Sequence, residues 1–126
     1  VGEVVFVKDS LMDAVTAVSG SGPAFVAYLI KDLGEEALER ILIKEAVSLG
    51  IEVLTAEILA KQTISGTKQM LKVNFDADIL IKRVSSKGGT TEAGMSVLEK
   101  NGKTENALSE AIRAAHNRAG ELSRRV

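Results

Sequence analysis

The chain has 126 residues, a length typical of one domain, and 45% of them are hydrophobic, which is enough to build a buried core. Only 3% are aromatic and there is no Trp, so this core must be aliphatic and rich in alanine. The 16 basic and 17 acidic residues are interspersed and the net charge is −1, so the sequence offers neither a basic stripe nor an aromatic stacking platform for nucleic acid.

Residue counts disfavour other classes of protein. With no Cys and one His, disulfides and sites built from several thiolates or imidazoles are excluded, and we expect no metal. No apolar run approaches the ~18–20 residues that cross a bilayer, and the first residues lack the pattern of a signal peptide. We therefore expect a cytoplasmic protein that has no membrane partner.

The first segment, residues 4–7 (Val-Val-Phe-Val), has the pattern of a β-strand. A single strand leaves its backbone hydrogen bonds unsatisfied, and the sequence contains no other convincing strand. The strand either pairs with another copy of the chain or is the last strand of a preceding domain. We favour the second interpretation, which divides the chain into a strand and linker at residues 1–9 and a helical domain at residues 10–126.

Hydrophobic residues at helical spacing predict helices along the rest of the chain. The first begins at Pro23, since proline suits a first helical turn, and Gly34 breaks or bends it after Leu33. The next runs to Leu49, and Gly50 fits its C-terminal cap. Four further helices are predicted at residues 55–71, 77–84, 91–100 and 105–125. Together they predict an all-α domain.

Single positions in these helices carry their own expectations. Gly66 destabilises its helix by roughly 1 kcal/mol relative to Ala, so we expect it to permit a close contact between helices. Asp76 and Asp78 lack further oxygen ligands for a metal, and they are expected to cap the helix that follows. His116 is expected at a surface or an interface, not in catalysis.

Two helices have predicted inward faces. The short helix at residues 77–84 is expected to turn Ile79, Leu80 and Val84 inward. The last helix is expected to bury one face, consisting of Leu108, Ala111, Ile112, Ala115, Ala119 and Leu122.

Two glycine-rich segments are the strongest functional signals. The first loop contains Ser19, Gly20, Ser21, Gly22 and Pro23; the second contains Ser86, Lys87, Gly88, Gly89, Thr90 and Thr91. A helix follows the second loop, and its unpaired first-turn N–H groups and positive dipole end favour an anion. Gly-Gly-Thr-Thr alone reads as a loop with an N-cap. The presence of a glycine-rich loop of the same kind upstream, the first loop, favours a site for a small carboxylate or phosphate at the second loop.

The motifs in their order resemble the C-terminal domain of pyrroline-5-carboxylate reductases. Residues 13–25 resemble the opening of that domain, and residues 84–91 with Val97, Leu98 and Glu99 resemble its signature. The resemblance also covers part of the predicted helix at residues 55–71 and the tail from Ala107 to Leu122. The resemblance implies an all-α, multi-helix dimerisation domain, similar to the C-terminal domain of 6-phosphogluconate dehydrogenase. Its parent enzymes reduce 1-pyrroline-5-carboxylate to L-proline, the last step of proline biosynthesis, with NADPH or NADH.

The resemblance also implies roles for both segments. The substrate loop would comprise Ser86, Gly88, Gly89, Thr90 and Thr91, whose amides would hold the substrate carboxylate. Thr91 matches the family threonine near the ring nitrogen, which makes it the candidate catalytic residue that orients or protonates the imine. The nicotinamide end of the cofactor would lie against Ser19, Gly20, Ser21, Gly22 and Pro23. Lys87 departs from the family pattern, because the family usually has proline there.

The sequence contains no Gly-x-Gly-x-x-Gly fingerprint after a strand, so the main cofactor site is expected on a separate domain. The resemblance further implies a homodimer, with dimers that often assemble further. One alternative stays open: a helical dimerisation module that kept the small-carboxylate loop and lost catalysis.

Overall fold

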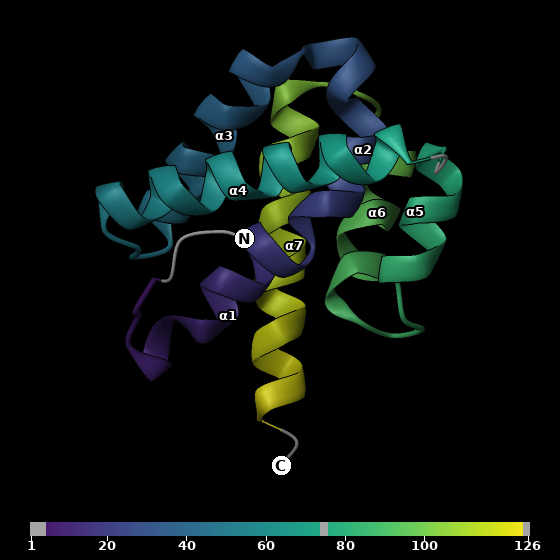
Figure 1. The fold of residues 1–126 in the computed structure, drawn as a ribbon. Helices are drawn as coiled ribbons and strands as arrows, with labels where there is room; N and C mark the ends of the chain where they lie inside the picture. Colours follow the sequence, from purple (N-terminus) through teal and green to yellow (C-terminus); the bar gives the residue numbers. More distant parts are fainter. Residues whose placement is uncertain (1–4, 74–75, 125–126) are drawn as a thin grey trace.

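The computed structural model describes residues 5–73 and 76–124, and most of them are helical (Figure 1). Its elements are a 3₁₀ turn (Asp9–Leu11), α1 (Met12–Val15), a π-helical turn (Thr16–Gly20), α2 (Gly22–Leu33), α3 (Glu35–Ser48), α4 (Val53–Lys72), α5 (Ala77–Val84), α6 (Thr90–Asn101) and α7 (Glu105–Ser123). The all-α prediction is confirmed.

The predicted N-terminal strand would pair with another copy of the chain or with a preceding domain, so the single chain does not test it and it stays a prediction. Residues 5–8 have no regular secondary structure, and Val4 lies outside the described residues. Without a second strand the backbone has no ladder to join. Val5 packs against the core instead, while Phe6 is 90% exposed. The division of the chain at residues 9 and 10 stays a prediction.

Glycines and capping side chains end the helices close to the predicted positions. Gly34 has φ +81° and donates its N–H to the Ile30 carbonyl at 3.0 Å, which closes α2. Gly50, with φ +105°, follows the end of α3. The Asp76 carboxylate caps α5 by accepting from the Ile79 N–H at 2.8 Å, as predicted, whereas Asp78 lies within the first turn.

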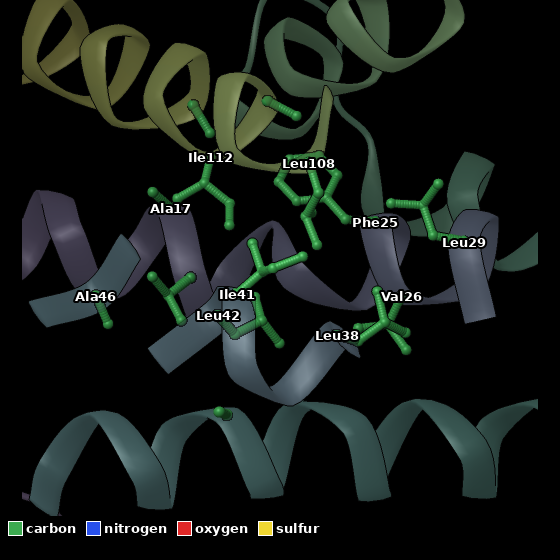
Figure 2. Packing of buried hydrophobic residues seen from close by; sticks show 14 of the residues in the cluster. Ala17, Phe25, Val26, Leu29, Leu38, Ile41, Leu42, Ala46, Leu108 and Ile112 are labelled. Carbon is green, nitrogen blue, oxygen red and sulfur yellow. The ribbon is translucent and has the colours of Figure 1, made fainter. Parts of the chain in front are cut away.

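Helix α7 is the centre of the domain. In Figure 1 it runs lengthwise through the molecule, α4 crosses in front of it, and α5 and α6 are both drawn to its right. Figure 2 shows Leu108 and Ile112 of α7 pointing toward residues of α2 and α3. The largest fully buried apolar side chains are Phe25, Leu29, Leu38, Leu42, Leu98, Leu108 and Ile112. The core is therefore aliphatic apart from Phe25, as the composition predicted.

The close helix contacts occur at glycines other than Gly66. A Cβ at Gly66 would meet no described heavy atom within 4 Å, so the predicted contact there is wrong within this chain. A Cβ at Gly22 would lie 2.7 Å from the Thr63 Cγ2, and one at Gly94 would collide with the Phe25 ring. These two glycines set the spacing of α2 from α4 and from α6.

Some predicted inward positions face solvent. On α5 only Leu80 is buried, whereas Ile79 and Val84 are 43% and 36% exposed. A helix of eight residues lying against α2 covers only one narrow stripe of its surface. Leu122 is 37% exposed near the end of α7, beyond the buried part of its predicted face. None of the described helices combines the length and apolar character needed to span a membrane.

Candidate functional site

The structure brings the two glycine-rich segments together. Ser21, which precedes α2, is fully buried, and its Oγ lies 2.9 Å from the Thr90 Oγ1. The Thr91 hydroxyl donates to the same Ser21 Oγ at 3.2 Å, and Thr91 is 5% exposed. Three hydroxyls from two distant segments therefore form one cluster, in which Ser21 and Thr91 are buried and Thr90 is partly buried. Each hydroxyl can donate and accept, so the cluster can change its donor directions without moving the backbone.

The first segment is a helical junction, not a loop. Residues Thr16–Gly20 form a π-helical turn, closed by the Ser21 N–H donating to the Thr16 carbonyl at 2.9 Å. Pro23 lies in the first turn of α2, as predicted. Helix α4 approaches the backbone closely at Gly22, so a residue without a side chain is needed at this position. Single π turns inside helices are frequent at functional sites.

The second segment is a loop between α5 and α6, and its two glycines are needed for different reasons. Gly88 has φ +74°, a conformation that residues with a side chain rarely adopt. Gly89 is extended, but a Cβ there would lie 2.6 Å from the Ser86 Oγ. The Gly89 N–H donates to the Ser86 carbonyl at 2.9 Å, which closes the turn.

The N-cap of α6 is Gly89, without a side-chain capping bond, so the threonine pair does not cap the helix. Thr90 and Thr91 are instead its first two residues, and their hydroxyls bond to Ser21. The purely structural reading of Gly-Gly-Thr-Thr as a threonine cap is therefore wrong. The first-turn N–H groups of α6 point toward the loop with no partner inside the helix, as at any helix start.

Both glycine amides of the predicted anion site already have partners within the chain, the Gly89 N–H in the Ser86 carbonyl and the Gly88 N–H in a carboxylate. The Gly88 N–H donates to the Glu92 carboxylate at 3.0 Å, so an internal anion lies beside the loop. Glu92 is the third residue of α6 and bonds the N–H one residue before the N-cap, which is related to the glutamate half of a capping box. Sequence reasoning missed Glu92, although this spacing was a usable signal.

Arg118 of α7 is the second residue that sequence reasoning missed. Its Nε donates to the Gly88 carbonyl at 2.8 Å, and its Nη1 lies 3.2 Å from a carboxylate oxygen of Glu121. Its side chain is only 23% exposed. No local pattern relates Arg118 to a loop 30 residues earlier, so only the folded chain reveals this contact.

Ser85, at the start of the same loop, has a buried Oγ that lacks a hydrogen-bond partner in the part of the chain that the structure describes. Buried hydroxyls are normally paired, so Ser85 is an exception among the described side chains.

The predicted cofactor residues differ in their exposure to solvent. Ser21 and Gly22 are buried, and Gly20 is exposed. Ser19 and Pro23 line an open pocket of about 430 Å³. The rest of the pocket wall comes from α4: Gln62, Thr63, Ser65, Gly66 and Gln69. The lining has amides and hydroxyls but no charged side chain. Among the described residues, no group of three or more side chains is arranged to hold a metal ion.

Comparison with known proteins gives consistent matches along the chain. Residues 9–122 match the family described as pyrroline-5-carboxylate reductase dimerisation. A pyrroline-5-carboxylate reductase of Synechocystis sp. is 44% identical over 126 residues, which are 99% of this chain and 43% of that protein. Pyrroline-5-carboxylate reductase 2 of Bacillus subtilis is 36% identical over 97% of this chain and 41% of its own length. The chain thus spans less than half of these relatives. No solved structure is significantly similar to it.

Proposed function

This chain belongs to the pyrroline-5-carboxylate reductase dimerisation family, and from that membership we propose that it is the C-terminal domain of a pyrroline-5-carboxylate reductase. The reaction proposed for the whole enzyme is reduction of 1-pyrroline-5-carboxylate to L-proline by NADPH or NADH. The observation that carries the proposal is the hydroxyl cluster of Ser21, Thr90 and Thr91, which joins the two glycine-rich segments at the start of α6.

The substrate is a small ring that carries a carboxylate and an imine. We assign its carboxylate to the loop of Ser86, Gly88 and Gly89 and to the first turn of α6, where backbone donors and the helix dipole favour an anion. The Gly88 and Gly89 N–H groups donate to Glu92 and to the Ser86 carbonyl, so the first-turn amides of α6 are assigned most of the binding. Reduction adds a hydride to the imine carbon and a proton to the ring nitrogen, and correct positioning supplies much of the rate.

Thr91 is the group proposed to orient or protonate the ring nitrogen. Its hydroxyl donates to Ser21, so a ligand engages it by exchanging that bond. Ser21 can donate to one threonine while it accepts from the other. The direction of these two bonds therefore determines whether the Thr91 hydroxyl offers its proton or a lone pair to the ligand. Burial of both side chains keeps water away from this exchange.

The nicotinamide end of the cofactor is assigned to the pocket beside Ser19 and Pro23, about 430 Å³ in volume. Its uncharged wall of amides and hydroxyls suits a neutral carboxamide ring, and its volume lies in the range of small-molecule sites. The cofactor supplies the hydride; the chain supplies the wall that holds its ring. The main dinucleotide site is assigned to a separate domain of the parent enzyme.

The matched family supports self-association of this chain. We propose a homodimer, with dimers that assemble further, in the cytoplasm. Exposed apolar side chains gather where α3 turns into α4: Val47, Val53 and Leu54 are 43%, 50% and 64% exposed. We assign this patch to the contact with the second copy, because burying apolar surface is the main driving force of association.

The deciding experiment is a titration of this chain with L-proline, in which calorimetry and amide NMR shifts measure binding. Wild-type protein should bind, and Thr91→Ala should bind more weakly while staying folded. Unchanged proline affinity in folded Thr91→Ala and Gly89→Val proteins would reject the substrate-loop assignment. A wild-type chain that binds proline but supports no reduction, even in its full-length parent, would favour the non-catalytic module.

A further inference from the structure

The conformation of the loop at residues 85–89 depends on one glycine. Gly88 has φ +74° and lies between two charged side chains from different elements. Its N–H donates to the Glu92 carboxylate of α6 at 3.0 Å, and its carbonyl accepts from the Arg118 Nε of α7 at 2.8 Å. Both polar groups of this residue are therefore held by side chains outside the loop.

Holding the Gly88 carbonyl also orients the next donor. The Gly88 carbonyl and the Gly89 N–H belong to one planar peptide group and point in opposite directions. Arg118 therefore determines where the Gly89 N–H points, and in the structure it points to the Ser86 carbonyl at 2.9 Å. A rotated peptide would displace the donors at the start of α6.

Charge at this glycine gives Arg118 a second effect. Glu92 places a negative charge beside the loop that is proposed to receive a carboxylate, and like charges repel. The Arg118 guanidinium, which also pairs with Glu121 at 3.2 Å, lies on the other side of Gly88 and offsets part of that charge. Its side chain is 23% exposed, whereas that of Arg113 on the same helix is 60% exposed, so Arg118 is the more shielded cation.

We propose that Arg118 is a positioning residue of the ligand loop: it holds the Gly88 carbonyl and offsets Glu92, so that a small carboxylate can bind at the start of α6. It acts through the backbone and does not touch the ligand. The inference rests on the proposed function, because it concerns the same loop.

The test compares Arg118→Gln with Arg118→Lys in the full chain, and Arg124→Gln is the matched control at the end of the same helix. Two quantities are measured: hydrogen exchange of the Gly88 and Gly89 amides without ligand, and calorimetric affinity for L-proline. Arg118→Gln should speed exchange at both glycines and weaken proline binding about tenfold, the size of a lost charge-assisted hydrogen bond. Lysine should restore part of the affinity, because it returns the charge without the Nε geometry. Arg124→Gln should change neither quantity.

The outcomes separate the two proposals. Wild-type exchange at Gly88 and Gly89 in Arg118→Gln overturns the positioning role, whatever happens to the affinity. Faster exchange in a chain whose wild type does not bind proline supports the loop role and overturns the proposed function instead. If Arg118→Gln fails to fold, Arg118→Lys is the second variant: it keeps the charge, loses the Nε geometry and should speed exchange at both glycines by a smaller factor. Wild-type exchange at both glycines in that variant would overturn the role.

Discussion

The Thr91 hydroxyl donates to the Ser21 Oγ at 3.2 Å across 70 residues of sequence, and both side chains are almost completely buried. This bond ties the start of α2 to the start of α6. It is the point where the proposed cofactor side and the proposed substrate side of the domain meet, and it forms the basis of the first prediction.

Ser21→Ala should lower both stability and ligand binding. The change removes the shared partner of two threonine hydroxyls, and a buried polar group left unsatisfied costs about 1–3 kcal/mol. Urea unfolding measures the stability, and proline titration measures the binding. Ser19→Ala is the matched control, because Ser19 is only half-buried and lines the open pocket. Equal stability of the two variants would contradict the importance of the cluster.

Gly89→Ala should destabilise the loop by steric overlap, at a cost of about 1–3 kcal/mol. The added Cβ would lie 2.6 Å from the Ser86 Oγ, so the double variant Gly89→Ala/Ser86→Gly should recover part of the thermal stability. Gly88→Ala should cost about 1–2 kcal/mol through its left-handed backbone. Ser86→Gly should not rescue that variant, and a rescue of both would refute the distinction between the two glycines.

Arg113→Met should destabilise the protein more than Glu45→Gln. Glu45 of α3 has a side chain that is 1% exposed and is held by the Arg113 Nε of α7 at 3.0 Å. Losing the arginine leaves a buried carboxylate without its cation, at a cost of about 2 kcal/mol or more. In Glu45→Gln the glutamine keeps an acceptor and removes the charge, so the loss of stability should be smaller. Chemical denaturation of both variants and of the double variant measures the difference; the reverse order would contradict this account.

Gly66→Ala should stabilise the isolated chain by roughly 0.5–1 kcal/mol, since alanine is the better helix former. No described atom lies within 4 Å of the added Cβ, so the change introduces no clash inside the chain. Gly22→Ala is the contrasting variant and should be destabilising, because its Cβ would lie 2.7 Å from Thr63. Thermal unfolding under dilute conditions distinguishes them. A destabilised Gly66→Ala would show that a contact outside this chain requires the glycine.

Leu54→Glu should weaken self-association without unfolding the protein, since the side chain is 64% exposed in the single chain. A charge at an apolar contact is costly to bury, so the dissociation constant of the dimer should rise. Light scattering over a concentration series measures the effect. Ile79→Glu, at an apolar position on α5 that is 43% exposed, serves as the control. Equal weakening by both variants would remove the α3–α4 corner from the interface.

Local sequence signals predicted the helices well, because hydrophobic periodicity, capping residues and glycines act within a few positions. Gly34 ends α2 and Asp76 caps α5 where the pattern placed them. The same reasoning failed for Ile79 and Val84, since which side of a short helix is covered depends on its neighbours. It also failed for Gly66, because the need for a small residue depends on what packs above it.

The sequence by itself determined the helical class, the aliphatic core, the two glycine-rich segments and their order along the chain. Only the tertiary structure decided that the first segment is a helical junction, that Ser21 meets Thr90 and Thr91, and that Arg118 reaches Gly88. The physical reason is the range of the interactions. Helix formation and capping are settled within a turn or two of backbone. Contacts between side chains far apart in sequence arise only when the packing of α2, α6 and α7 brings them within hydrogen-bonding distance.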